Sequence, residues 1–232
     1  MDRRTFVGGT AAAVAGLTLG CQAGEMEPSG RPDSSSNPGK ILIDGASVFD
    51  VRTGRMLPAT NVLMDEGVIQ AVGPRNALNR GADAASGARV IDGSGLYVIP
   101  GLIDAHVHLS HILYQSQMTG DEVLPFYLGH GVTSIRSTGD NVPAARMVEL
   151  FAKDRPDTSP NVFRGSFLID GNPVWHPDVG WALTDAADVE PFVADMAAWG
   201  VTTLKLYIGV EREIGRRVIE VGHEHGLVVS GH

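Results

Sequence analysis

The sequence predicts an α/β fold in which a partial (β/α)₈ TIM barrel of about five strands follows a small β-sandwich subdomain. After residue 101, β-rich runs alternate with helical patterns, which is typical of parallel strands joined by crossover helices. Before residue 100, short β-rich runs are separated by turn residues. The chain has 43% hydrophobic and 19% charged residues, an ordinary composition for a protein that buries a core.

The first 21 residues have the features of an export signal. Arg3 and Arg4 precede a short apolar stretch that ends at Gly20 and Cys21. This stretch is too short for a bilayer, which takes about 20 apolar residues. We predict a twin-arginine signal at residues 1–21, with Cys21 as a lipidated residue that attaches the protein to a membrane. The expected location is therefore the periplasm, either free or as a membrane-anchored lipoprotein.

Two further segments precede the predicted barrel. Residues 22–40 are rich in Ser, Pro and Gly, a composition that predicts a flexible linker. Residues 41–100 contain short β-rich runs, with hairpin signals at residues 65–67 and 92–93. We interpret this region as the N-terminal half of a β-sandwich subdomain.

Residues 101–232 are expected to form the partial barrel. The predicted parallel strands are residues 102–106, 132–137, 162–169, 201–208 and 227–230. The clearest predicted helix runs over residues 185–199, with Thr184 as its N-cap and Gly200 where it should end. The expected strands place several polar side chains at one rim, where barrel enzymes keep their active sites.

A His-x-His pair lies at the end of the first of these strands. Alternate residues of a strand face the same side, so His106 and His108 can hold one metal ion. The alternative is that both are buried, hydrogen-bonded histidines without a ligand. Asp104 shares their face one layer deeper and fits a supporting role.

Lys205 lies within an apolar strand, on the opposite side from Leu204 and Leu206. Lysine is rarely buried without a partner, and burial favours its neutral amine. A neutral amine can react with carbon dioxide to form a carbamate, an anionic group that bridges two metal ions. The alternative is a lysine whose charged end reaches the surface along its apolar stem.

The remaining candidates lie at other strand ends. His232 ends the last predicted strand and completes the set of candidate metal ligands. Tyr207 shares the face of Lys205, and His176 follows the third strand, so both can contact a substrate. His111 and His130 are expected at the solvated surface.

Residues 90–93 and 96–108 together resemble the signature of the amidohydrolase superfamily, and residues 131–136 and 226–232 resemble its imidazolonepropionase and prolidase-like branch. The resemblance implies a β-sandwich before a (β/α)₈ barrel. It also implies that His106 and His108 bind one zinc ion and His232 a second. Lys205, carboxylated, would bridge the two.

The resemblance also implies residues that this chain does not supply. The family has a second histidine on the sixth strand and a metal-binding aspartate, the proton acceptor, on the eighth. Only 131 residues follow Gly101, whereas a whole barrel takes about 250. We therefore assign no catalytic residue here, and we expect the 232-residue polypeptide alone to be inactive and poorly soluble. Ser137 also stands where relatives often have aspartate.

The functional prediction is a metal-dependent hydrolase of C–N bonds (amide, peptide or cyclic amide), with a dipeptide or other small molecule as substrate. A prolidase-like dipeptidase is the first expectation. The alternatives are a mononuclear cyclic-amide hydrolase or deaminase, and a non-catalytic exported lipoprotein that binds a ligand. The net charge of -9 argues against a nucleic-acid partner.

Overall fold

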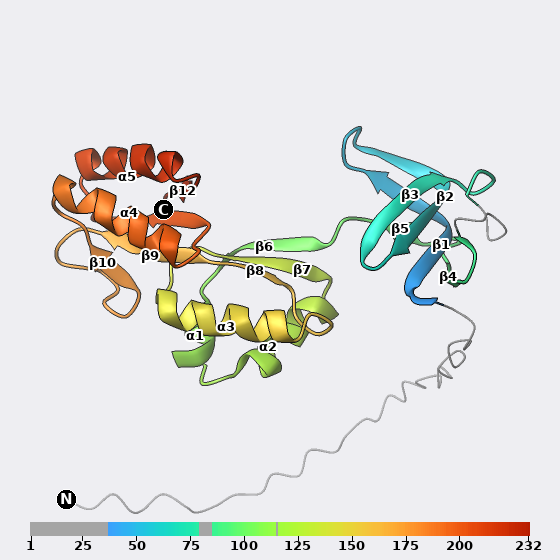
Figure 1. The fold of residues 1–232 in the computed structure, drawn as a ribbon, viewed down its shortest axis with the longest axis horizontal. Helices are drawn as coiled ribbons and strands as arrows, with labels where there is room; N and C mark the ends of the chain where they lie inside the picture. Colours follow the sequence, from blue (N-terminus) through green and yellow to red (C-terminus); the bar gives the residue numbers. More distant parts are fainter. Residues whose placement is uncertain (1–36, 79–84, 115) are drawn as a thin grey trace, which may run out of the picture. The chain divides into compact units, whose positions relative to one another are not determined.

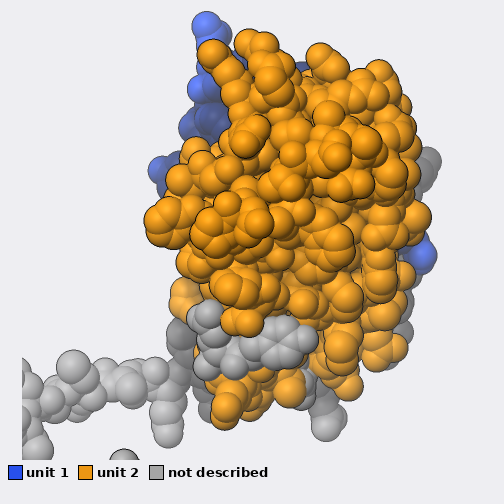
Figure 2. Space-filling model, turned by 90° about the vertical axis from the view of Figure 1, so that its left-hand side faces the viewer, with its two compact units in different colours: residues 1–98 blue, residues 99–232 orange. Residues whose placement is uncertain are grey.

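A computed structural model describes residues 37–78, 85–114 and 116–232, which form two compact units (Figures 1 and 2). One unit extends to Val98, and the other covers Ile99–His232. The predicted export signal and Cys21 lie outside the described residues. None of the described helices is long and apolar enough to cross a membrane.

The first unit is built around one five-stranded sheet. Its long first strand, β1, pairs antiparallel with β2 and parallel with β4 and β5, and β3 lies at the outer edge beside β2. The strands are β1 (Asn37–Asp50), β2 (Arg55–Asp65), β3 (Val68–Pro74), β4 (Ala88–Asp92) and β5 (Tyr97–Val98).

One expectation for this region needs correction. The predicted linker ends too late, because residues 37–40 already belong to β1, where Asn37 pairs with Ala88 and Lys40 with Asp65. The described residues of this unit form a single sheet with a small apolar core on each face. Val62 and the neighbouring Leu63 belong to these two different apolar clusters, because successive strand residues point to opposite faces.

The second unit contains two sheets in which every strand pair is parallel. One has the order β6-β7-β8 and the other the order β10-β9-β11-β12. The strands are β6 (Leu102–Val107), β7 (Val132–Ser137), β8 (Asn161–Phe163), β9 (Gly165–Asp170), β10 (Gly180–Ala182), β11 (Thr203–Leu206) and β12 (Val228–Ser230). This mixed α/β arrangement with parallel sheets agrees with the predicted fold class.

The third predicted strand is broken in two at Arg164. The first piece, β8, pairs with β7, and the second piece, β9, pairs with β11. The side chain of Arg164 is 2% exposed, and its Nε lies 2.5 Å from Glu149 Oε2. Its Nη2 donates to the carbonyls of Trp199 and Gly200, at 2.5 and 3.2 Å. These polar partners explain why the strand breaks at this residue.

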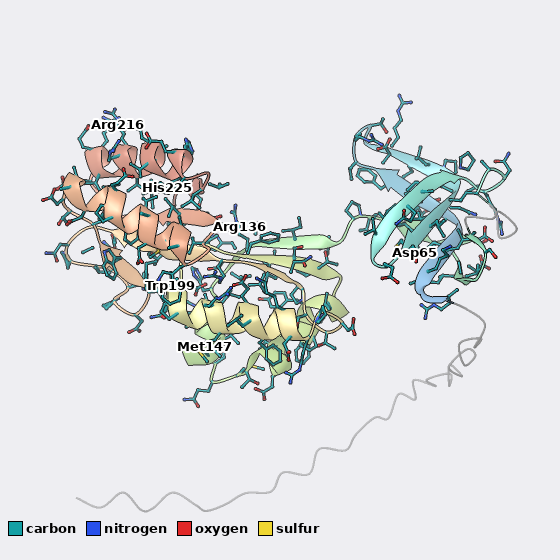
Figure 3. All side chains as sticks on the ribbon, viewed as in Figure 1. Asp65, Arg136, Met147, Trp199, Arg216 and His225 are labelled. Carbon is teal, nitrogen blue, oxygen red and sulfur yellow. The ribbon has the colours of Figure 1, made fainter. Side chains whose placement is uncertain are left out.

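Helices cover the sheets in two groups (Figures 1 and 3). Residues of α1, α2 and α3 pack with β6, β7 and β8 in one apolar cluster. Residues of α4 and α5 pack with β9, β11 and β12 in a second apolar cluster. The helices are α1 (Leu109–Tyr114), α2 (Gly120–Gly129), α3 (Val142–Asp154), the 3₁₀ turn η2 (Ala186–Asp188), α4 (Val189–Ala198) and α5 (Arg212–Glu224).

The predicted helix over residues 185–199 is present but begins differently. A 3₁₀ turn precedes α4, and its N-cap is Asp185, whose carboxylate accepts a hydrogen bond from the amide of Ala187 at 2.8 Å. The predicted cap, Thr184, lies one residue earlier. Gly200 does end the helix, because it adopts a positive φ of 73° and donates to the carbonyl of Ala197.

Candidate functional site

All six residues predicted to bind metal or substrate lie around one cavity of about 80 Å³ at the carboxyl ends of the parallel strands. They come from β6 and the residue after it, from the loop after β9, from β11 and its following loop, and from the end of the chain. The six are His106, His108, His176, Lys205, Tyr207 and His232. Thus residues up to 126 positions apart in the sequence line the same space.

Three imidazoles form one side of the cavity. The ring centroids of His106 and His108 are 5.4 Å apart, and those of His106 and His232 are 6.5 Å apart. Both pairs have nearly perpendicular planes, at 71° and 81°. The rings therefore meet edge to face and are not stacked.

His108 is oriented by a backbone contact. Its Nδ1 lies 2.7 Å from the carbonyl oxygen of Gly139, in the loop after β7. Because a carbonyl can only accept, Nδ1 carries a proton, and in the neutral form of the ring Nε2 has a free lone pair. This arrangement is the one by which proteins orient histidines that bind metals.

The pKa of His106 lies below its ordinary value. Burial lowers its pKa, and the neighbouring positive charges of Lys205 and His108 lower it further. Its backbone amide donates to Asp104 Oδ1 at 3.1 Å. A neutral imidazole offers a lone pair to a ligand at neutral pH.

Lys205 points to the cavity side of β11, as strand alternation predicts. It is 3% exposed, whereas Leu204 lies in the apolar core on the other side. Its Nζ donates to the carbonyl of Gly231 at 2.9 Å. Burial lowers the pKa of Lys205, and the charge of Arg136 on β7 (labelled in Figure 3) lowers it further. The surface-reaching alternative is therefore wrong for this lysine.

His176 and Tyr207 form a pair at the edge of the cavity. His176 Nε2 lies 3.1 Å from the hydroxyl of Tyr207, and their ring centroids are 5.5 Å apart. Tyr207 also packs against His232, with ring centroids 5.0 Å apart. Two groups that can donate hydrogen bonds thus stand beside the histidine cluster.

Two surface predictions have different outcomes. His111 is only partly exposed and lines the cavity from α1, with its ring centroid 4.9 Å from that of His108, so its assignment to the solvated surface was wrong. Burial lowers the pKa of His111, and the charge of His108 adds to this effect. His130, in contrast, is exposed and bonds the carbonyl of Phe126.

Sequence reasoning also missed a buried carboxylate that supports the site. Asp140 is fully buried, and its oxygens accept from the amides of Leu109 and Ser110 at 2.9 and 2.8 Å. The hydroxyls of Ser110 and Ser137 donate to it as well. Asp140 therefore fixes the two residues that directly follow His108.

The types of side chain that line the cavity are suited to binding zinc. Imidazole nitrogens are preferred zinc ligands, and here five imidazole rings line a cavity that is also lined by a lysine amine of lowered pKa. In the described part of the chain, however, no three His, Cys, Asp or Glu side chains lie close enough together to enclose an ion. The residues that would hold a metal are thus gathered around a small cavity and do not form a closed cluster.

Known proteins resemble this chain in sequence. No family model matches it. A dihydroorotase of Ruminiclostridium cellulolyticum is 46% identical over 70 residues, which cover 30% of this chain and 14% of that protein. An adenine deaminase of Bacillus subtilis is 24% identical over 199 residues, which cover 83% of this chain and 31% of that protein.

Solved structures resemble the fold. A prolidase in complex with N-methylphosphonate-L-proline has a TM-score of 0.65 and 19% identity, and the match covers 83% of this chain and 56% of that chain. Bottromycin amidohydrolase has a TM-score of 0.64 and 25% identity, with 85% and 40% covered. The predicted resemblance to the amidohydrolase superfamily is confirmed.

The amidohydrolase resemblance extends over most of this chain but over only part of each relative. The chain spans at most about a third of these two curated relatives and about half of the prolidase.

Proposed function

We propose that the protein is a metal-dependent hydrolase of C–N bonds with two zinc ions. The supporting observation is that His106, His108, Lys205 and His232, from three strand ends, line one cavity. In this proposal His106 and His108 hold one ion and His232 holds the other. Lys205, once carboxylated, would supply the anionic group between them.

Carboxylation of Lys205 requires a neutral amine. In the reaction the amine nitrogen bonds to the carbon of CO₂ and loses one proton to solvent, which leaves an anionic carbamate. Burial favours this reaction because it lowers the pKa of the amine. The product carries a negative charge among three imidazoles, where metal ions would compensate it.

When bound, zinc polarises a carbonyl group and makes a water molecule a potent nucleophile at neutral pH. The contribution of the chain itself is orientation. His108 is fixed by Gly139. When His176 Nε2 donates its hydrogen to the Tyr207 oxygen, the Tyr207 hydroxyl can donate its own hydrogen to an oxygen of the substrate. The proton-accepting aspartate implied by the family is not assigned to any residue of this chain.

A dipeptide with a C-terminal proline is the substrate proposed first. One similar structure is a prolidase with a proline phosphonate, and another is a Xaa-Pro dipeptidase with methionine in its active site. A dipeptide has a carboxylate and an amide carbonyl, and both accept hydrogen bonds of the kind that the Tyr207 hydroxyl can donate.

A mononuclear cyclic-amide hydrolase or deaminase is the second candidate. The dihydroorotase and adenine deaminase among the sequence relatives favour it. Buried Lys205 favours the binuclear site instead, because a bridging carbamate has a use only where two metals are present.

The test uses purified full-length protein reconstituted with zinc. Metal content is measured first, and then hydrolysis of Xaa-Pro dipeptides, dihydroorotate and adenine is compared. We expect two zinc ions per chain and turnover of the dipeptides. Turnover of only dihydroorotate or adenine with one ion per chain would support the second candidate. Zinc or ligand binding with no turnover of any substrate would support the non-catalytic lipoprotein.

We also propose the finer architecture and the location. The second unit forms the first five strands of a barrel, in the order β6, β7, β8 with β9, β11 and β12. This proposal is supported by parallel neighbours that follow chain order, as in (β/α)₈ barrels. The first unit forms half of a β-sandwich. For the location, the twin arginines and Cys21 support export and membrane attachment through a lipid.

A further inference from the structure

Asp170 is a fully buried carboxylate that the proposed chemistry does not use. It ends β9, and its oxygens accept only backbone amides. Oδ1 accepts from Gly171 at 3.0 Å and from Gly209 at 2.8 Å, and Oδ2 accepts from Trp175 at 2.8 Å. Three amide donors can compensate a buried negative charge.

These amides belong to two different loops. Gly171 and Trp175 lie in the loop after β9, which continues directly into His176. Gly209 lies in the loop after β11, two residues beyond Tyr207. One carboxylate therefore connects the two loops that carry the cavity residues His176 and Tyr207.

The two loops touch at their glycines. A Cβ atom on Gly171 would collide with the carbonyl oxygen of Gly209, and a Cβ on Gly209 would lie 2.7 Å from Asp170 Oδ1. Both positions therefore require glycine for close approach. The contact leaves little freedom for one loop to move without the other.

We propose that Asp170 is a positioning residue that holds the loops after β9 and β11 together, so that His176 and Tyr207 act as one substrate-binding pair. The proposal rests on the proposed function in that it assigns the pair to substrate binding. Asp170 lines no part of the cavity and acts through the two loops.

The first test is Asp170→Asn in the full-length protein. An amide in place of the carboxylate points N–H groups at a backbone amide and removes the negative charge. We expect KM for the hydrolysed substrate to rise about tenfold, the equivalent of roughly one hydrogen bond, with kcat and metal content nearly unchanged. Asp185→Asn, which alters an exposed cap on η2, is the matched control and should leave KM unchanged.

Double substitution separates positioning from general stability. If Asp170 acts through Tyr207, then adding Asp170→Asn to Tyr207→Phe should raise KM by less than about twofold beyond the single Tyr207→Phe variant. Additive effects would overturn the proposal. If Asp170→Asn does not fold, Gly171→Ala is used in the same cycle, because its Cβ separates the loops while Asp170 stays.

Hydrogen exchange tests the loop connection without any activity. The amide hydrogen of Gly209, which lies 39 residues from Asp170, should exchange faster with solvent in Asp170→Asn than in the wild-type protein. Its exchange rate in Asp185→Asn should equal that of the wild type. Unchanged exchange at Gly209 would overturn the proposal even if KM rises. If the wild-type protein binds metal but hydrolyses nothing, the proposed function fails, and the exchange at Gly209 still decides whether Asp170 connects the loops.

Discussion

Lys205 Nζ donates a hydrogen bond of 2.9 Å to the carbonyl of Gly231, the residue directly before His232. The bond joins the side chain of β11 to the backbone at the end of β12. Two of the four proposed metal-holding residues are thus connected before any metal binds. A change at Lys205 should therefore affect the position of His232 as well as remove its own amine.

The first prediction is that Lys205→Ala loses one of two metal ions. Without the bridging group, kcat/KM should fall about a thousandfold or more, since several kcal/mol of charge stabilisation are lost. Metal analysis and dipeptide kinetics measure both effects. Lys153→Ala is the control, because that lysine is exposed and pairs with Glu149. An unchanged content of two metals in Lys205→Ala would refute the carbamate assignment.

The second prediction concerns Asp140, which fixes the two residues after His108. Asp140→Asn replaces an acceptor of two amides and two hydroxyls with a group that must donate at one of these places. Zinc affinity should fall about tenfold, as for other changes behind a metal ligand. Competition with a chelator measures the affinity, and Asp157→Asn on the surface is the control. Equal affinities would show that Asp140 serves only the fold.

Strand periodicity predicted the central part of the site. Alternation placed His106 and His108 on one face, and it placed Lys205 opposite Leu204, where the structure finds them. The strand β7 has the predicted bounds. These features depend on neighbours within one strand, and a local pattern is sufficient to predict them.

Contacts between distant segments escaped the sequence reasoning. Asp140 and Asp170 bind amides 30 to 39 residues away, and no spacing rule connects such partners. The position of His111 at the cavity was also missed, because α1 begins at Leu109 and Ser110, whose amides donate to the distant Asp140. Arg164 within an apolar run, followed by Gly165, was the available signal for the break between β8 and β9.

The third prediction concerns Cys21 and rests on the sequence alone. Cys21→Ser removes the thiol that would carry the lipid, so the exported protein should move from the membrane fraction to the soluble periplasmic fraction. Fractionation of cells followed by immunodetection measures this change. Replacing Arg3 and Arg4 by lysine should instead retain the protein in the cytoplasm. A wild-type protein found only in soluble fractions would contradict lipidation.

The fourth prediction concerns the buried pair of Glu149 and Arg164. The side chains are 11% and 2% exposed, and Glu149→Gln leaves the arginine without its counter-charge. The free energy of unfolding should fall by about 3–5 kcal/mol, the usual cost of breaking a buried pair. Urea unfolding measures it. Glu190→Gln is the control, since that glutamate makes exposed pairs with Arg217 and His225, and it should cost less than about 1 kcal/mol.

The fifth prediction is the pH dependence of the same pair. Burial acts to raise the pKa of Glu149, but hydrogen bonds from Lys153 and Arg146 and the charge of Arg164 outweigh it, so the pKa lies below its ordinary value. For a carboxylate with a lowered pKa, the stabilisation is fully present above the unfolded-state value of about 4.5 and is lost as the pH falls through the folded-state value. The difference in unfolding free energy between wild type and Glu149→Gln should therefore be constant from pH 7 to 5 and shrink at lower pH. Urea midpoints measured at each pH test this, and a difference that stays constant down to pH 3 would show that another interaction stabilises Arg164.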